Sequence, residues 1–346
     1  MNITCTDLNR NIFKRSAMRF QELLFLCLSK SRASSPASMS FQEEIHDFTN
    51  LDKIGEGSYS VVYKGLNQKT KKLVAIKKID KRQRNEYIKR FLPRELKLVK
   101  SLNHPNVIRV FDIIESPTYV CMIEEYAEKG DLLQLIKAKK RIDEVEGRLL
   151  FRQLIEGLRY LEMKRIVHRD LKCENLFLDA HYNLKIGDFG FARYLLSGEV
   201  SNTFCGSKAY VALEIMQSTE YCDNSIDIWS SGVVLYVMIT GENFIRIMPF
   251  DDRKQNEMIS MQRDHKIRFP RGMPSDSARK LIMYMLHPDP NKRATLEKIL
   301  TSEWLGGTKY ALRGPVVEEQ KEEDSGCSTA SQISESDLQA LRRTVD

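Results

Sequence analysis

The sequence lacks any apolar run that approaches the ~18 consecutive residues typical of a membrane-spanning helix. An integral membrane protein is therefore excluded. The short apolar stretch Leu23–Leu28 is too brief and lies too far from the start to predict a secretory signal. A mitochondrial presequence or a helix on a membrane surface stays open for this leader, beside a short helix or a disordered segment.

The spacing of the cysteines also matches no disulfide or metal-binding motif. There are seven, without a C-x-x-C pair or an even set of close spacings, so they predict free thiols in a reducing, cytoplasmic compartment. The net charge of +7 could indicate nucleic acid, but the basic residues are spread along the chain and no aromatic-interleaved RNA-binding motif accompanies them. We therefore expect no nucleic-acid partner.

Three regions follow from composition. Residues 1–47 form a leader, residues 48–305 form the one folded domain, and residues 306–346 form an acidic, serine-rich tail that is predicted to be disordered because it has little apolar surface to bury. Within the domain, β-branched runs dominate up to about residue 124 and apolar residues spaced three or four apart dominate from about residue 131 to 305. The predicted fold class is α+β, with a small strand-rich lobe and a larger helical lobe.

The strand-rich lobe holds the first chemical motif. A loop with two glycines, Gly55 and Gly57, links two expected strands, and glycines there let backbone amides approach phosphates closely. Lys77 ends a later apolar strand expected at Leu73–Ile76, and such a lysine needs an anionic partner, for which Glu95 on a helix expected at 84–102 is the candidate. A plain hairpin and a surface ion pair remain the alternatives for these features taken singly.

The helical lobe holds the second motif. His168-Arg169-Asp170 is followed five residues after the aspartate by Asn175, and then by Asp188-Phe189-Gly190. Phosphoryl transfer requires a carboxylate that accepts the proton of the attacking hydroxyl, which is the role expected of Asp170. Asn175 and Asp188 offer the oxygen ligands that Mg²⁺ prefers. The two fragments in this order and spacing are highly specific.

With these motifs the chain resembles the eukaryotic protein kinase superfamily from about Phe48 to Leu305. Lys172 and Ser207 resemble the serine/threonine branch, and a G-x-x-x-x-G-K-[ST] loop of other ATPases is absent. The resemblance implies the two-lobed kinase fold, ATP and Mg²⁺, and protein substrates. A monomer is the default expectation. The catalytic residues would be Asp170 and Lys172. The nucleotide would contact Ile54, Gly55, Glu56, Gly57, Ser58, Tyr59, Ser60, Val61, Val62, Ala75, Lys77, Glu95, Glu125, Ala127 and Phe177.

Finer segments resemble the testis-specific serine/threonine kinases of the calcium/calmodulin-kinase-like group. These segments are 91–95, 130–133, 203–207 and 249–252. The resemblance implies expression in male germ cells. It also aligns Thr203 with the activation-loop phosphosite, whose phosphate could meet Arg169 and could be added by an upstream kinase.

Substrate choice is expected to depend on two acids. Asp131 and Glu174 fall at positions that, in basophilic relatives, face an arginine three residues before the target, and Ser207 falls in the substrate-binding segment. A third acidic position of some relatives is Val237 here, so no special preference is expected for arginine two residues before the target. Asp131 and Glu174 could instead be solvated surface acids.

Some positions depart from the family pattern. Ser60 replaces the third glycine, Lys208 and Leu213 replace prolines, and residues 242–247 look like an insertion. Glu124 takes the position behind the adenine, where a buried carboxylate must be paired, protonated or turned away. These departures keep a second function open, a pseudokinase scaffold that binds partners without turnover.

Overall fold

The computed structural model describes residues 45–57, 59–83, 85–195, 207–217, 224–241, 248–250 and 253–314. Thr203, Ser58 and the insertion at 242–247 lie outside these residues. Met1–His46 and the rest of the chain form separate units, and all that follows concerns the unit that begins at Asp47. Across the described ranges, no helix is both long enough and apolar enough to cross a membrane.

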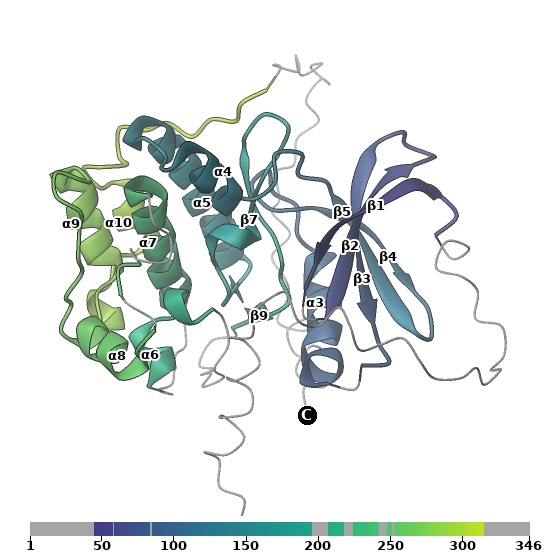
Figure 1. Ribbon diagram of the computed structural model, residues 1–346, viewed down its shortest axis with the longest axis horizontal. Helices are drawn as coiled ribbons and strands as arrows, with labels where there is room; N and C mark the ends of the chain where they lie inside the picture. The colour runs from purple at the N-terminus through teal and green to yellow at the C-terminus, as the bar shows by residue number, and fades with distance from the viewer. Residues whose placement is uncertain are drawn as a thin grey trace, which may run out of the picture. The chain divides into compact units, whose positions relative to one another are not determined.

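The strand-rich lobe is one antiparallel sheet of five strands in the order β1-β2-β3-β5-β4 (Figure 1). Its strands are β1 (Phe48–Glu56), β2 (Ser60–Asn67), β3 (Leu73–Asp80), β4 (Val110–Glu115) and β5 (Tyr119–Glu125). β3 and β5 are the most buried, as their continuous apolar sequences predict.

Strand β4 begins later than the expected 107–111. Val107 forms a bridge with Ile186, and the Ile108 amide donates to the Ile186 carbonyl at 2.8 Å, so the start of this run joins the helical lobe. Ile186 belongs to β8 (Leu184–Ile186). The backbone hydrogen bonds of Asn106 and Ile108 with Ile186 therefore link the two lobes rather than extend the sheet.

The expected helix at 84–102 is shorter and has two parts. A π-helical turn, Tyr87–Phe91, leads directly into α3 (Leu92–Val99). Pro93 lies at the start of α3, and it has no N–H to bond the carbonyl of Lys89 four residues earlier. Pro93 therefore interrupts the regular α-helical hydrogen bonding at this point. α3 carries Glu95 towards the sheet, where Glu95 is 1% exposed.

The helical lobe is built around two long helices (Figure 1). α5 (Glu144–Met163) packs against α7 (Ser225–Thr240), and all residues of α7 are buried. The shorter helices are α4 (Leu132–Lys139), α6 (Leu213–Met216), α8 (Gln255–Arg263), α9 (Asp276–Met285) and α10 (Leu296–Leu300). Two short antiparallel pairs, β7 (Leu176–Leu178) with β8 and β6 (Ile166–Val167) with β9 (Arg193–Tyr194), carry the catalytic segments. The predicted fold class is confirmed.

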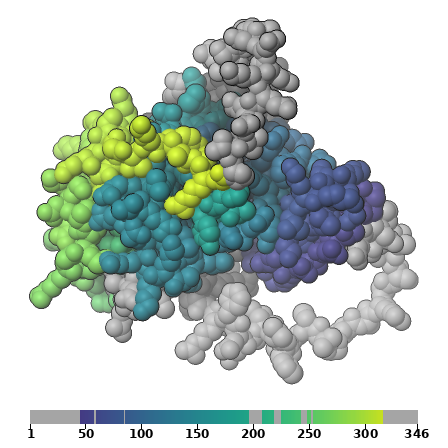
Figure 2. All heavy atoms as spheres, turned by 90° about the horizontal axis from the view of Figure 1, so that it is seen from above, coloured from purple at the N-terminus to yellow at the C-terminus, as the bar shows by residue number. Residues whose placement is uncertain are grey.

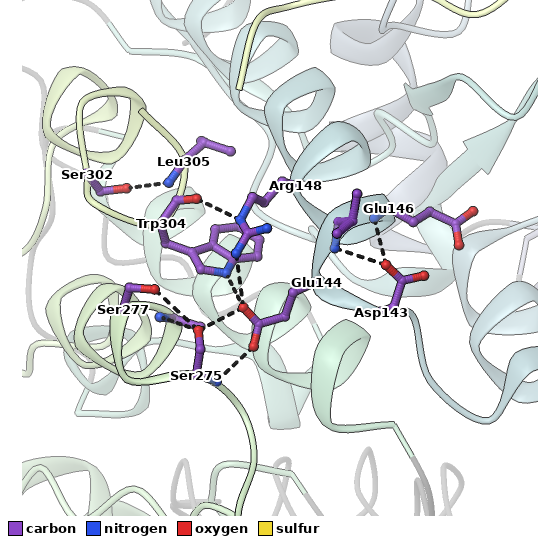
Figure 3. A network of polar contacts seen from close by, with 11 residues as sticks. Asp143, Glu144, Glu146, Arg148, Ser275, Ser277, Ser302, Trp304 and Leu305 are labelled. Atoms are coloured by element: carbon purple, nitrogen blue, oxygen red, sulfur yellow. Dashed lines mark hydrogen bonds and ion pairs between the residues drawn. The ribbon is translucent and has the colours of Figure 1, made fainter. Parts of the chain in front are cut away.

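Glu144 at the start of α5 forms hydrogen bonds with the residue that caps α9 and with a residue that follows α10 (Figure 3). Its carboxylate accepts hydrogen bonds from the Ser275 amide at 2.7 Å, the Ser275 hydroxyl at 2.7 Å and the Trp304 indole at 2.8 Å. Arg148 lies over the Trp304 ring. Burial alone would raise the pKa of Glu144, but these hydrogen bonds outweigh it and lower the pKa below its ordinary value.

The sequence predicts that the domain ends at Leu305, but the structure describes the chain as far as Gly314. Residues 306–314 run over the surface of the helical lobe (yellow in Figure 2). Arg313 exchanges two hydrogen bonds with Asn183, the Ala311 carbonyl accepts from Gln153 at 2.8 Å, and the Tyr310 hydroxyl donates to Asn106 at 2.8 Å. This part of the expected tail is thus bonded to the domain, and residues 315–346 lie outside the described ranges.

Replacing Glu144 by Gln should lower the free energy of unfolding by about 1.5 to 3 kcal/mol, because Ser275 and the buried Trp304 lose a charged acceptor. Since the folded-state pKa is lowered, this difference is full above about pH 4.3, the ordinary glutamate value, and shrinks as the pH falls below it. The matched control is Glu303→Gln, which disrupts only the exposed ion pair with Lys280 and should change stability by less than about 0.5 kcal/mol. Equal effects of both variants in denaturant unfolding would contradict this assignment.

Candidate active site

A cleft of about 720 Å³ is lined by residues of both lobes. Most of the predicted nucleotide-contacting residues line it: Ile54, Gly55, Glu56, Gly57, Ser60, Val62, Ala75, Lys77, Glu125, Ala127 and Phe177. Of those predicted and described, Tyr59, Val61 and Glu95 do not line it. Two further lining residues were not indicated by the sequence: Ile108, whose segment pairs with β8, and Gly187, which directly follows β8.

Lys77 on β3 is the central cation of the cleft. Its ammonium group donates to Glu95 at 2.9 Å and to Asp188 at 2.9 Å, so one lysine joins β3, α3 and the segment after β8. Burial alone would lower the pKa of Lys77, but the two carboxylates raise it well above its usual value. In turn, the Lys77 ammonium lowers the pKa of Asp188 to about 2. Lys77 and Asp188 are therefore both ionised at neutral pH, and Glu95 is the carboxylate partner of the lysine that the sequence predicts.

Asp170 is surrounded by hydrogen-bond donors. One of its oxygens accepts from the Ser207 amide at 2.9 Å and the Ser207 hydroxyl at 3.2 Å, and the other accepts from Lys172 at 2.7 Å and Asn175 at 3.2 Å. The structure thus brings together four predicted residues that come from two distant segments. These bonds hold the carboxylate in a single orientation. One of the donors, Asn175, lines the cleft.

Asn175 and Asp188 offer oxygen atoms to a metal. The side-chain nitrogen of Asn175 donates to the Asp170 carbonyl at 2.8 Å, so its oxygen remains the ligating atom. Asp188 is ionised and its side chain is 42% exposed. One amide oxygen and one carboxylate fit Mg²⁺, which typically binds through one or two such groups together with phosphate oxygens.

The catalytic segment depends on the buried carboxylate of Asp227 in α7. It accepts hydrogen bonds from the backbone amides of His168 at 2.7 Å and Arg169 at 2.9 Å. Arg169 has a positive φ of 69°, a conformation that costs energy for a residue with a side chain. Asp227 thus braces the catalytic loop, and a second buried contact of the helical lobe is the ion pair between Glu214 and Arg293 at 2.7 Å.

Glu124 lies on β5 and lines the cleft. Burial raises the pKa of its carboxyl to about 7, although Lys77 opposes this effect. A group with that pKa is about half protonated at neutral pH and can then donate a hydrogen bond. Of the three outcomes that the sequence left open for this carboxylate, partial protonation is the one that the structure favours.

Two departures from the family pattern fit the structure without disruption. Leu213 replaces a proline at the first residue of α6, where it is 6% exposed and fills the core. A proline at this position would fix a helical φ but is not required to start a helix. Lys208 begins the short turn Lys208–Tyr210 that follows Ser207, and the Ser207 contacts with Asp170 are made with lysine in place.

Comparisons with known proteins agree with this geometry. The family described as "Protein kinase domain" matches residues 48–305. Testis-specific serine/threonine-protein kinase 1 of Homo sapiens is 38% identical over 284 residues, which cover 80% of this chain and 76% of that protein. Testis-specific serine/threonine-protein kinase 2 of Mus musculus is 39% identical over 260 residues, which cover 73% of this chain and 71% of that protein. The chain therefore belongs to the protein kinase family, among relatives that are testis-specific serine/threonine kinases.

Proposed function

We propose that this chain transfers the γ-phosphoryl group of Mg-ATP to serine or threonine hydroxyls of proteins. The observation that carries the proposal is the convergence of Asp170, Lys172, Asn175 and Asp188 beside a cleft whose inner cation is Lys77. Phosphoryl transfer depends mainly on positioning and on stabilising negative charge, and these side chains supply both.

Each group has a distinct part in the reaction. Lys77 binds phosphate oxygens of the nucleotide and is oriented by Glu95. Asp170 orients the substrate hydroxyl and accepts its proton, while Lys172 offsets negative charge at the phosphoryl group that is being transferred. Asn175 and Asp188 would hold Mg²⁺, which neutralises charge on the phosphates when bound.

The four donors around Asp170 also suggest how a substrate enters. A carboxylate has about four lone-pair sites, and all are in use here. The two longest bonds, from the Ser207 hydroxyl and from Asn175 at 3.2 Å each, are the ones that an incoming hydroxyl can replace. Ser207 would then keep its bond with Lys172, now 3.1 Å long, and mark the edge of the substrate site.

Location and assembly remain predictions. The names of the matched relatives support expression in male germ cells, which transcript levels across tissues would decide. The cytoplasmic location follows only from the pattern of cysteines, and the monomeric state is only the default expectation.

The first prediction tests transfer itself. Asp188→Ala should abolish Mg²⁺-dependent transfer, and Asp170→Asn should lower kcat by about 10²- to 10⁴-fold with a smaller effect on the KM for ATP. The measurement is incorporation of labelled phosphate into a basic protein substrate. Asp264→Asn, which alters an exposed ion pair with Lys266, serves as the control and should leave both constants unchanged. Full activity of the Asp170 and Asp188 variants would refute the assignment, and an inactive wild-type chain would favour the scaffold.

The second prediction concerns activation by phosphate on Thr203. Arg169 supports this proposal because it adjoins Asp170 and its guanidinium donates to the Phe191 carbonyl, just after Gly190. A phosphate on Thr203 would add nearly two negative charges, and a cation that contacts both catalytic segments is a suitable partner for them. Thr203→Ala should lower kcat severalfold or more, whereas Ser201→Ala in the same segment should not. Mass spectrometry of the active enzyme provides the check: an absence of phosphate on Thr203, together with a fully active alanine variant, would exclude the mechanism.

The third prediction concerns substrate choice. Asp131 and Glu174 both line the cleft, and one oxygen of Glu174 is buried without a hydrogen-bond partner among the described residues. Val237, in contrast, is 2% exposed inside α7 and cannot contact a peptide. Peptides with arginine three residues before the target should therefore be phosphorylated about tenfold better, the scale of one charge-assisted hydrogen bond. Arginine two residues before the target should bring little gain.

A positional peptide library measures this preference. The variant to compare combines Asp131→Asn with Glu174→Gln, because Asp131 also caps α4 by accepting the Gln134 amide at 2.8 Å and asparagine caps helices equally well. The exposed Glu128, which also lines the cleft, provides the control variant Glu128→Gln. A preference that survives the double variant, or that is lost equally in the control, would rule out these two acids as the readers of arginine.

A further inference from the structure

Tyr87 has no part in the reaction described above, yet it contacts three segments of the site. It begins the π-helical turn before α3 and is 6% exposed. Its hydroxyl donates to Glu95 at 2.5 Å. Glu95 uses its other oxygen for Lys77, so the two oxygens of this buried carboxylate have one partner each. Burial raises the pKa of Tyr87, which keeps its hydroxyl protonated and able to donate.

The ring of the same side chain meets the glycine loop. Tyr59 at the tip of that loop stacks on Tyr87 with ring centroids 4.7 Å apart and an angle of 10° between the rings. Aromatic pairs with centroids at this separation add to the stability that burial alone provides. The position of the loop tip is therefore linked by direct contact to the residue that orients Glu95.

The third contact is with the segment that carries Asp188. Gly190 lies so close that a Cβ added to it would be 3.4 Å from the Tyr87 ring and 3.6 Å from a Glu95 oxygen. One turn further along the π-helical segment, Phe91 packs edge-on against Phe191 at 5.7 Å. The short turn Tyr87–Phe91 thus touches the glycine loop, α3 and the metal-binding segment together. Departures from regular α-helix of this kind often occur at functional sites.

We propose that Tyr87 is a positioning residue that couples closure of the glycine loop over the nucleotide to the Lys77–Glu95 ion pair. A loop closed on the nucleotide keeps Tyr59 against the Tyr87 ring, and the Tyr87 hydroxyl then holds Glu95 in the orientation that serves Lys77. When the loop opens, Tyr87 loses one of the contacts that fix its ring. Glu95 then depends more on Lys77 alone. The inference rests on the proposed transfer reaction, because its effect is seen in that reaction.

Two variants separate the two contacts of Tyr87. Tyr87→Phe keeps the ring and its stacking but removes the hydroxyl, whereas Tyr59→Leu removes the stacking and leaves the hydroxyl in place. Tyr87→Phe should lower kcat/KM for ATP by about tenfold, the scale of one hydrogen bond to a charged group, with part of the loss in kcat. Tyr59→Leu should mainly raise the KM for ATP, by about threefold.

The double variant tests the coupling. If the hydroxyl transmits the position of the loop, the combined loss is smaller than the product of the two single losses by about threefold or more. The control is Tyr236→Phe in α7, which removes another buried hydroxyl, bonded to the Arg268 carbonyl at 2.5 Å, far along the chain from the site. This control should lower the melting temperature but leave kcat and KM unchanged.

Affinity for Mg-ATP is measured on the same proteins by titration, so that the inference and the proposed function can fail separately. An active wild-type enzyme with Tyr87→Phe within twofold of it in kcat, KM and affinity would overturn the role of Tyr87. Single losses that simply multiply in the double variant would overturn the coupling. If the wild-type chain binds nucleotide but transfers nothing, the proposed function fails. The coupling would still be supported if the double variant loses less affinity for Mg-ATP than the product of the losses in the two single variants.

Discussion

The ammonium group of Lys77 lies between two carboxylates, those of Glu95 and Asp188, at 2.9 Å from each. A buried cation without such partners would be strongly destabilising, so the strand, the helix and the segment after β8 must come together for the strand-rich lobe to tolerate this lysine. The same requirement places a fixed positive charge at the inner end of the cleft. The architecture around the cleft and its capacity to bind phosphates therefore have a common physical origin.

The chemical core of the site could be predicted from sequence because each of its residues is required by type and by spacing. Asp170, Asn175 and Asp188 lie where their motifs place them, since short segments with fixed bonding carry them: the Asp227 carboxylate holds the backbone before Asp170, and the β7–β8 hairpin lies between Asn175 and Asp188. The two-lobed fold was predictable for a related reason. Its strands and helices have apolar periods that differ clearly.

Other features depend on contacts that no local pattern reveals. The start of the 107–111 run joins β8 because backbone groups of the other lobe compete for it, and the π-helical turn at 87–91 arises where Pro93 interrupts regular bonding. Burial among its neighbours in the sheet raises the pKa of Glu124. The sequence indicated only that a carboxylate stands at a position expected to be buried. Nothing in the sequence indicated Tyr87, because its importance comes from three neighbours that are brought to it by the fold.

The segment 308–313 supplies hydrogen-bond partners to three buried side-chain amides. Asn106, Gln153 and Asn183 are each less than 5% exposed, and each bonds this segment. Buried amides that lose such partners destabilise a protein. The bonded domain thus extends past the family boundary at Leu305, and this segment is joined through Tyr310 to the loop at Asn106 that follows α3. Asn106 also donates to the Leu184 carbonyl at 2.7 Å and accepts from the Ile186 amide at 2.8 Å, so the loss of this segment would weaken the attachment of the loop after α3 to β8.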